Sequence, residues 1–540
     1  MKTDRREFLK YGLITSSLFV GSMYSFNKLQ NRKRATSYSG DLIESSGRGH
    51  TLRQALKQTP IHFQKQPVLI VGAGMTGLIT GYYLKLNGFT NFKILELNSQ
   101  PGGNSQYGEN AVSKFPWGAH YVPLPNKENK DLVEFLKGLG LADKNTKTNT
   151  VEFKDEYLCQ DPQERLLIKG DWQESLLPGK NILEKDHSQL ARFHKIVEEF
   201  KYKKGRDGKF AFSIPVMHSS QDAEFLNLDS ITFDQFLINE KLDSSVVRWY
   251  LNYCVLDDYG MGLETVSAWA GLHYFCSRRP VDDYDEHKIL TWPEGNGWIL
   301  DKLQSSIKDH IEMNQAVLSI KTESKNSVLT SVYNFESKNV TEIECEKLVF
   351  SAPQFLLPYL MKDSKSKFGV TADDYYSWLV ANVTVRMTRE QLNELHWDNV
   401  QFQSNSLGYV HARHQSLRSH IDTKTVLTLY WPLFDKSMTA SEVRKKIANM
   451  KWQDWAPRVE AEFESMHPGI ASSIEKMDIK IYGHAMIGPR VGRMKQVLSQ
   501  STKSISDNIY YAHTDNSGMS LFEEAHYWGL KTAKDILANV

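Results

Sequence analysis

The feature that most constrains the fold is a glycine-rich turn between a strand-like and a helix-like stretch. Residues 68–71 read Val-Leu-Ile-Val, a continuous aliphatic run typical of a strand buried on both faces. The turn at residues 72–77 follows directly, and residues 75–86 predict a helix that ends near Asn87-Gly88. A second strand is predicted over residues 92–95. This order of strand, turn, helix and strand predicts an α/β fold.

The turn has the pattern G-x-G-x-x-G, and each glycine has a distinct task. Gly72 permits the tight turn, Gly74 lets a pyrophosphate approach the backbone, and Gly77 lets the helix pack against the strand. Glu96 ends the second strand about 20 residues further on, where it can accept hydrogen bonds from a ribose and disfavours the 2′-phosphate of NADP. The predicted dinucleotide-binding residues are Gly72, Ala73, Gly74, Met75, Thr76, Gly77 and Glu96.

A second glycine motif helps to choose between NAD and FAD. The stretch Glu96-Leu-Asn-Ser-Gln-Pro-Gly-Gly-Asn-Ser105 resembles the second motif of the flavin-containing amine oxidase superfamily, which includes monoamine and polyamine oxidases, protoporphyrinogen oxidase and carotenoid desaturases. In that motif an arginine follows the glycine pair, whereas this chain has Asn104. The resemblance implies non-covalent FAD, with phosphate contacts from backbone N–H groups and neutral side chains at Gly102, Gly103, Asn104 and Ser105.

Further segments match the same superfamily in the same order along the chain. Residues 115–121 resemble the segment that passes the flavin ring, which implies contacts from Gly118, Ala119 and His120. Residues 292–300 resemble a turn before a helix, and residues 348–353 resemble the strand-to-proline turn of the cofactor domain. Residues 316–320 resemble the strand whose valine touches the adenine, here Val317.

The last match lies near the C-terminus. Residues 508–512 predict a strand and residues 521–537 a helix, as in members of the superfamily. The resemblance implies that Asp515 binds the ribityl chain. Backbone N–H groups near Leu521 and Phe522 would then stabilise negative charge at the flavin N1/O2 edge.

The catalytic candidates depart from a standard amine oxidase. Many amine oxidases have a lysine near flavin N5, but residues 378–385 contain none, and Asn382 is the nearest polar candidate. The position of the family's aromatic cage holds Leu521. His120 and His513 lie on segments expected near the flavin and are candidate proton acceptors, although a lone histidine is more often a hydrogen-bonded structural residue.

Acidic residues between the cofactor motifs offer a second kind of candidate. Asp257, Asp258, Glu264 and the run at 282–286 could attract a cationic amine. A solvated loop explains such a run equally well. These residues therefore leave the substrate open.

The start of the chain resembles a twin-arginine export signal. Asp-Arg-Arg-Glu-Phe-Leu-Lys at residues 4–10 precedes a mild apolar run over residues 11–26, shorter than the roughly 20 apolar residues of a membrane-spanning helix. Residues 1–30 are therefore expected to be a signal, and residues 31–64 a polar linker. We expect export by the Tat translocase to the periplasm or another extracytoplasmic compartment, with membrane contact only if the signal is not removed.

Length and composition bound the remaining possibilities. At 540 residues, at least two domains are expected. A net charge of +1 suggests no nucleic-acid partner, and four scattered cysteines suggest no metal site. We expect a Rossmann-like FAD-binding domain assembled from residues 65–125, 285–358 and 483–540, and a mixed-sheet substrate domain from residues 126–284 and 359–482.

Three functions are compatible with these expectations. The first is oxidation of an amine, possibly a polyamine, by hydride transfer to flavin N5. The second is desaturation or oxidation of an apolar small molecule. The third is an exported flavoprotein that carries electrons or assists assembly without a small substrate of its own. Fold does not decide among them, because function depends on the site.

Overall fold

The computed structural model divides into two compact units, Met1–Ser39 and Gly40–Val540. The structure describes residues 38–539 except for 45–46, 51, 53–54, 146–148, 280–287, 362–368, 417–421 and 500–504. The proposed export signal and the acidic run at 282–286 lie outside the described residues. Among the residues searched, no helix has both the length and the apolar character that a membrane crossing requires.

In the described part of the chain, one sheet has seven strands in the order β12-β3-β2-β15-β14-β13, with β21 paired to β15. The strands are β2 (His62–Val71), β3 (Phe92–Leu95), β12 (Ile311–Glu312), β13 (Gln315–Ser324), β14 (Ser327–Asn334), β15 (Val340–Phe350) and β21 (Ile509–Tyr511). The pairs among β12, β3, β2, β15 and β21 are parallel, whereas β13, β14 and β15 pair antiparallel. The aliphatic run at 68–71 is buried, as a strand covered on both faces requires.

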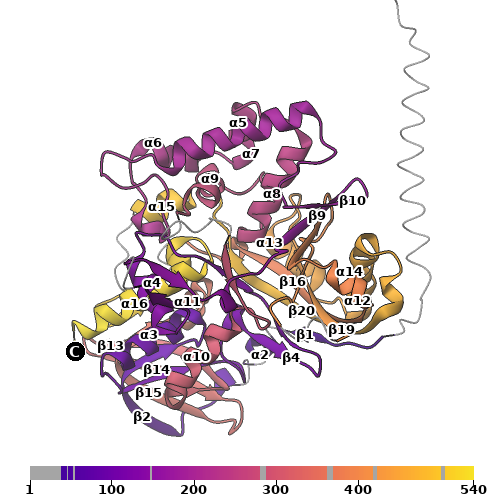
Figure 1. Cartoon of the computed structure of the whole chain (residues 1–540). Helices are drawn as coiled ribbons and strands as arrows, with labels where there is room; N and C mark the ends of the chain where they lie inside the picture. Colours follow the sequence, from indigo (N-terminus) through magenta and orange to yellow (C-terminus); the bar gives the residue numbers. More distant parts are fainter. Residues whose placement is uncertain are drawn as a thin grey trace, which may run out of the picture. The chain divides into compact units, whose positions relative to one another are not determined.

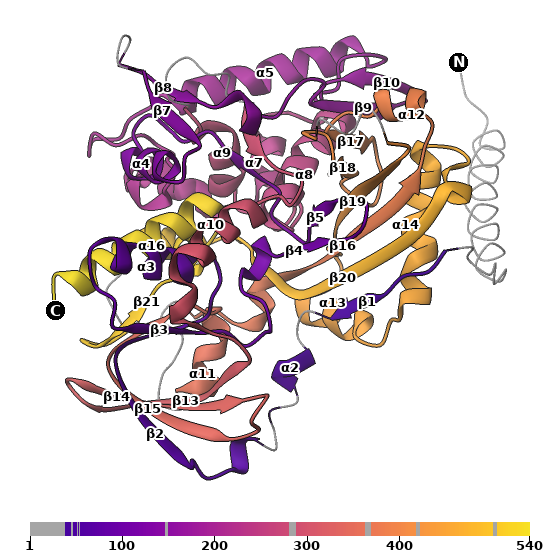
Figure 2. The ribbon, with the colours of Figure 1, turned by 60° about the horizontal axis from the view of Figure 1, so that its bottom comes forward.

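Helices α3 (Met75–Leu86), α10 (Gly297–Ile307) and α16 (Phe522–Leu537) belong to the same core as this sheet. Figure 2 shows α16, from the end of the chain, beside α3. Gly529 permits this approach, because a Cβ at that position would lie 2.9 Å from the Thr76 carbonyl oxygen. The predicted helix at 75–86 and strand at 92–95 are confirmed.

In the described residues the second large sheet has eight strands in the order β1-β20-β16-β19-β18-β17-β9-β10. They are β1 (Leu42–Glu44), β9 (Glu164–Ile168), β10 (Asp171–Glu174), β16 (Tyr375–Arg386), β17 (Asp398–Gln401), β18 (Tyr409–His411), β19 (Lys424–Pro432) and β20 (Ile474–Ile487). Most pairs are antiparallel, but β1 with β20 and β17 with β9 are parallel. β1 lies within the stretch expected to be a linker, where it extends the edge of the sheet.

Helices form a layer beside this second sheet (Figure 1). They include α5 (Glu184–Lys201), α6 (Ala223–Leu226), α7 (Phe233–Asn239), α8 (Ser245–Tyr259) and α9 (Ala268–Cys276). Their buried side chains form one apolar cluster together with residues of α15 (Arg493–Ser499).

Shorter elements complete the described part of the chain. The two-stranded pairs are β4 (Tyr107–Glu109) with β5 (Lys114–Pro116), β6 (Tyr121–Pro123) with β11 (Ile289–Thr291), and β7 (Ala142–Lys144) with β8 (Val151–Phe153). The remaining helices are α2 (Gly47–His50), α4 (Lys130–Gly138), α11 (Leu357–Leu360), α12 (Arg389–Asn393), α13 (Ala440–Ile447) and α14 (Trp452–Met466).

The predicted α/β fold with a Rossmann-like domain built from separate segments is confirmed, and its sheet draws strands from the start, middle and end of the chain. The domain boundaries stay a prediction. Helix α4, within the segment assigned to the substrate domain, shares a core with α3, and β20 runs across the boundary drawn at residue 483. All four cysteines are buried and free.

Candidate functional site

The first glycine turn combines closely packed and open positions. Gly72 has φ of +104°, and a Cβ there would lie 2.8 Å from the Ser351 carbonyl oxygen. A Cβ at Gly77 would lie 2.1 Å from the Gly72 carbonyl oxygen, so the fold itself requires glycine at both positions. A Cβ at Gly74 would meet no atom within 4 Å. The turn therefore leaves open space beside Gly74, at the N-terminus of α3, where unpaired N–H groups favour an anion.

The second glycine motif lies directly against the first. The Gly102 N–H donates to the Ala73 carbonyl at 2.7 Å. A Cβ at Gly103 would be 3.5 Å from Gly74 Cα. Ser105 is buried in the following turn, and Ala73, Met75 and Thr76 are buried in the first. The two glycine motifs are separated in the sequence by a helix and a strand, but the fold brings the backbone of both turns together.

Glu96, which follows the last residue of β3, forms a hydrogen bond to the first turn. One carboxylate oxygen accepts from the Ala73 N–H at 3.0 Å and the other from the Asn98 N–H at 2.9 Å. Burial raises the pKa of Glu96, and these hydrogen bonds oppose that rise. Each carboxylate oxygen can accept a further bond, as a ribose hydroxyl would require. Val317 lies on β13 and is partly buried against the core cluster that contains Leu95.

Asn104 connects the second glycine motif to the segment at 117–121. Its backbone oxygen accepts from the Ala119 N–H at 2.8 Å, and its side chain donates to the Ala485 carbonyl at 2.7 Å. A Cβ at Gly118 would lie 2.2 Å from the Asn104 oxygen, so this contact requires glycine. The neutral side chain of Asn104 therefore links the turn to β20.

His120 follows this segment and belongs to a group of rings. It stacks on Tyr430 at 4.3 Å between ring centroids and lies 5.6 Å from Trp397. The Tyr430 hydroxyl donates to the Gly118 carbonyl at 3.0 Å. Burial lowers the pKa of His120 to about 4, so the imidazole is neutral at pH 7.

Asp515 is buried and forms a separate group with partly exposed His513 and two tyrosines. One oxygen of Asp515 accepts from the hydroxyls of Tyr375 and Tyr511 and from the Gln354 N–H. The other lies 3.1 Å from His513 Nδ1. Burial acts to raise the pKa of Asp515, but His513 and the hydrogen bonds outweigh it and hold that pKa below its ordinary value. Leu521 is the N-cap of α16, and Phe522 is its first residue.

Asn382 lies on β16 with both ends of its amide engaged. The amide N–H donates to the Pro116 carbonyl at 3.0 Å, and the amide oxygen accepts from the Thr428 hydroxyl at 2.7 Å. The side chain is 3% exposed. These bonds fix the segment that leads to Gly118 and His120 onto the second sheet.

A lysine that sequence reasoning missed lies on the neighbouring strand. Lys480 of β20 pairs in register with Val380 of β16, within the stretch where a lysine was sought. It is 5% exposed and donates to the Gln106 side chain at 2.8 Å, with the ring of Tyr482 4.8 Å from its ammonium. Burial lowers its pKa to about 8. Its alternation with apolar Ile479 and Ile481 is typical of a solvent-facing lysine, so the sequence carries no signal for its burial.

The acidic candidates separate in the structure. Glu264 is exposed and pairs with Lys436 at 3.2 Å. Asp258 lies near Arg278, which forms an ion pair with Glu523 at 2.6 Å.

Asp257 instead faces the rings, where it accepts from the Tyr121 hydroxyl at 3.3 Å. Burial raises its pKa to about 6. Asp398, which the sequence did not single out, accepts from Tyr253 at 3.4 Å. Its pKa is raised well above the ordinary value by burial and by Glu164 and Asp257.

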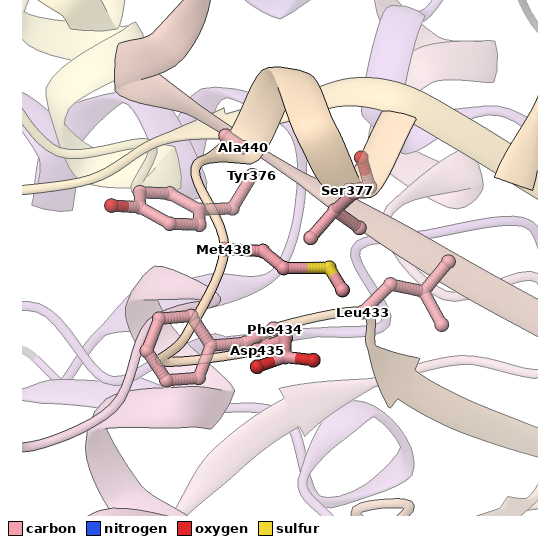
Figure 3. A pocket seen from close by; sticks show the side chains of 8 residues that line it. Tyr376, Ser377, Leu433, Phe434, Asp435, Met438 and Ala440 are labelled. Atoms are coloured by element: carbon pink, nitrogen blue, oxygen red, sulfur yellow. The ribbon is translucent and has the colours of Figure 1, made fainter. Parts of the chain in front are cut away.

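A shallow pocket lies at the start of β16, away from the candidate residues. Figure 3 shows Met438 in the middle of the lining, with Tyr376 and Phe434 on one side of it and Ser377 and Leu433 on the other. None of the predicted site residues lines it. Among the described residues, no group of three or more His, Cys, Asp or Glu is arranged to hold a metal ion.

Comparison with known sequences finds one family. The NAD(P)-binding Rossmann-like domain matches residues 70–139, which include both glycine turns and the ring segment up to His120. No curated protein matches the sequence significantly.

Solved structures resemble nearly the whole chain at low identity. Putrescine oxidase bound to putrescine has a TM-score of 0.64 at 13% identity, over 88% of this chain and 100% of that one. Cyclohexylamine oxidase from Brevibacterium oxydans IH-35A has a TM-score of 0.62 at 13% identity, over 88% and 99%. A fatty acid isomerase from P. acnes that produces CLA has a TM-score of 0.57 at 16% identity, over 87% and 98%. These likenesses show that the chain shares their fold.

Proposed function

We propose that this protein is an FAD-dependent oxidoreductase that oxidises an amine, with polyamines among its candidate substrates. The observation that carries the proposal is a continuous path from the glycine turns to the rings. The Gly102 N–H donates a hydrogen bond to the Ala73 carbonyl, and the Ala119 N–H donates to the Asn104 carbonyl. The Tyr430 hydroxyl donates to the Gly118 carbonyl, and the Tyr430 ring stacks on His120. A cofactor with a diphosphate at one end and a reactive ring at the other suits such a path.

The residues present fit FAD. The open space at Gly74, between two sets of backbone N–H groups, suits a diphosphate that approaches closely. Glu96 offers a carboxylate to the adenosine ribose. Gly72 to Gly77, Gly102 to Ser105 and Val317 would hold the adenosine diphosphate half. Gly118 to His120 and the N-terminus of α16 at Leu521 and Phe522 would hold the flavin half. Asp515 is fully buried with both oxygens engaged, so it would act by fixing the turn before α16 rather than by the direct ribityl contact that the resemblance implies.

Bound FAD would supply the acceptor for a hydride equivalent from the carbon beside the substrate nitrogen. The C–H bond breaks with its electron pair, the nitrogen lone pair forms the C=N bond, and an N–H proton is released. Water then hydrolyses the imine. The nitrogen must be neutral for this step, because its lone pair forms the new bond.

This chain's residues would prepare the amine. His120 is neutral at pH 7 because burial lowers its pKa to about 4, so it can accept a hydrogen bond from an N–H group without adding positive charge. Tyr430 and Trp397 give flat apolar surfaces beside it. Asn382 acts as a positioning residue through Pro116.

The putrescine and cyclohexylamine oxidases support an amine substrate, and the fatty acid isomerase supports an apolar one. Asp257 and Asp398 favour the amine, since an apolar substrate would gain nothing from carboxylates among the rings. An electron carrier without a small substrate would likewise have no use for them.

The test is anaerobic titration of the purified protein. An absorbance band near 450 nm would support bound flavin, and its bleaching by amines but not by polyenes or fatty acids would support amine oxidation. Bleaching by apolar compounds alone would favour the second function, and a band that no compound bleaches would favour the third. Protein without flavin, and unable to bind added FAD, would refute the proposal.

We further propose that the protein is exported through the twin-arginine pathway, with the Tat translocase as partner. The support is the paired-arginine sequence at residues 4–10 and the apolar run that follows it. Replacement of Arg5 and Arg6 by lysine should retain the protein in the cytoplasm, as measured by cell fractionation. Unchanged export of this variant would refute the pathway.

A further inference from the structure

One face of helix α8 points a carboxylate into a row of aromatic rings. Trp249, Tyr253 and Asp257 follow one another at intervals of four residues, so they share a face of the helix. The Trp249 ring lies 5.9 Å from Tyr253 and 4.7 Å from Phe402. Asp257, at the end of this row, accepts from the Tyr121 hydroxyl at 3.3 Å.

A second carboxylate faces the same rings from β17. Asp398 accepts from the Tyr253 hydroxyl at 3.4 Å. The ring centroid of its neighbour Trp397 lies 5.9 Å from that of Tyr121 and 5.6 Å from that of His120. Tyr253 is thus bonded to one carboxylate and Tyr121 to the other. We call Asp257 and Asp398, with Tyr121, Tyr253, Trp397, Tyr430 and His120, the acidic aromatic cluster.

No cation within the described residues neutralises these two carboxylates. The charged groups that act most strongly on Asp398 are Glu164 and Asp257, both negative. The side chain that donates a hydrogen bond to Asp257 is the neutral hydroxyl of Tyr121. Asp258, next in the chain, has Arg278 nearby. Burial raises the pKa of both groups, and Glu164 and Asp257 raise that of Asp398 further, so protons are favoured there in the free protein. A ligand that brings positive charge would favour the ionised form of both groups in place of those protons.

We propose that Asp257 and Asp398 bind an ammonium group of the substrate other than the one that is oxidised, so that the protein selects diamines and polyamines over monoamines. This inference rests on the proposed amine oxidation. The rings of the acidic aromatic cluster add attraction for the same group, because an ammonium is stabilised over the face of tyrosine or tryptophan. Asp257 and Asp398 are therefore specificity-determining residues.

The chemistry of the two nitrogens explains why they must differ. An ammonium between carboxylates keeps its proton, because opposite charge favours the charged form. Hydride loss needs a neutral nitrogen, whose lone pair forms the C=N bond. The nitrogen bound by Asp257 and Asp398 therefore cannot be the reacting one, and the substrate must carry at least one more amine.

Partial exposure lets a ligand reach the cluster. Asp257, Asp398, Tyr121 and His120 each retain intermediate solvent exposure. Asn is isosteric with Asp and cannot carry its negative charge, so Asp257→Asn and Asp398→Asn are expected to fold at least as stably as the native protein. Glu264→Gln is the matched control, because it removes a carboxylate from the surface just beyond α8.

The first measurement is calorimetric binding of butyltrimethylammonium to the FAD-loaded protein. This cation has no nitrogen lone pair and cannot be oxidised, so binding is measured without turnover. We expect Asp257→Asn and Asp398→Asn each to raise its Kd about tenfold to a hundredfold. Glu264→Gln should leave the Kd unchanged. An unchanged Kd in both cluster variants, or no binding to the native protein, would overturn the inference.

The second measurement separates this inference from the proposed function. The ratio of kcat/KM for 1,4-diaminobutane to that for butylamine should fall at least tenfold in the cluster variants and should be unchanged in Glu264→Gln. An equal loss for both amines would overturn the inference but leave amine oxidation standing. Oxidation of neither amine by native protein that contains flavin and binds the cation would instead refute the proposed function.

Discussion

Replacing either of two glycines in the same turn by alanine should have different effects: loss of stability at Gly77 and loss of FAD affinity at Gly74. At Gly77 the added Cβ would lie 2.1 Å from the Gly72 carbonyl oxygen, a backbone atom that cannot rotate away. Overpacking against backbone costs about 3 kcal/mol, at the upper end of its usual range. Alanine inside α3 recovers about 1 kcal/mol of helix propensity. The net loss of stability expected for Gly77→Ala is therefore about 2 kcal/mol.

At Gly74 the added Cβ meets no atom within 4 Å. The residue is the N-cap of α3 with φ −71° and ψ 175°, which alanine adopts without strain. The loss of a glycine cap is offset by the smaller entropy of the unfolded chain, so Gly74→Ala should change the stability of the flavin-free protein by less than about 1 kcal/mol. The same methyl group would occupy the space proposed for the diphosphate, and the Kd for FAD should rise at least tenfold.

The assay uses flavin-free protein for both variants. Urea denaturation gives the change in unfolding free energy, and fluorescence titration with FAD gives the Kd. If Gly74→Ala destabilised the flavin-free fold as much as Gly77→Ala, the space beside Gly74 would be structural. If Gly74→Ala bound FAD like the native protein, the diphosphate would not lie there.

Three further predictions concern buried charge. Above pH 8 the folded state releases the proton of Lys480, whereas the unfolded state keeps it. The unfolding free energy of the native protein minus that of Lys480→Met should therefore rise between pH 8 and 10, by about 3 kcal/mol at most. If urea denaturation gives a difference that does not change with pH, Lys480 is not buried as described. Burial raises the pKa of Asp257 to about 6 and that of Asp398 well above its ordinary value, so both groups lose negative charge as pH falls from 7 to 5 and the Kd of butyltrimethylammonium should rise. Asp257→Asn should reduce this dependence without removing the part due to Asp398; His120, with a pKa of about 4, remains mostly neutral in this range. Arg278→Met leaves Glu523 without its cation and should lower the unfolding free energy by about 3 kcal/mol, measured by urea denaturation. Adding Glu523→Gln to this variant should restore part of the lost stability.

Local patterns predicted the cofactor half of the fold well. The boundaries of α3 and β3 agree with the sequence prediction because the aliphatic run, the glycines and the helix stop at Asn87 act over short distances. The second glycine motif could be recognised by resemblance, although its contact with the first, Gly102 to Ala73, is tertiary.

The acidic aromatic cluster could not be read from the sequence in the same way. Asp257 and Asp258 are neighbours with the same local signal, yet one faces rings and the other lies near Arg278. Asp398 lies on a different element, and its contact with Tyr253 spans the helical layer and the second sheet. Lys480 was missed because its burial depends on Gln106 and Tyr482, and no spacing along β20 encodes that contact.

The parallel pairing of β2 with β15 has a consequence for synthesis of the chain. His62 pairs with Thr341, and β21, at residues 509–511, must still add to the far end of β15. At about 5–20 residues per second, a ribosome needs roughly half a minute to two minutes for the chain, and most of that time passes before β15 and β21 emerge. One edge of the apolar run Val68–Val71 can pair with β3 once residues 92–95 have emerged, but its other edge waits for β15, exposed to chaperones and to other nascent chains. A stalled or truncated chain would leave the ribosome with both glycine turns made and the sheet that supports them incomplete.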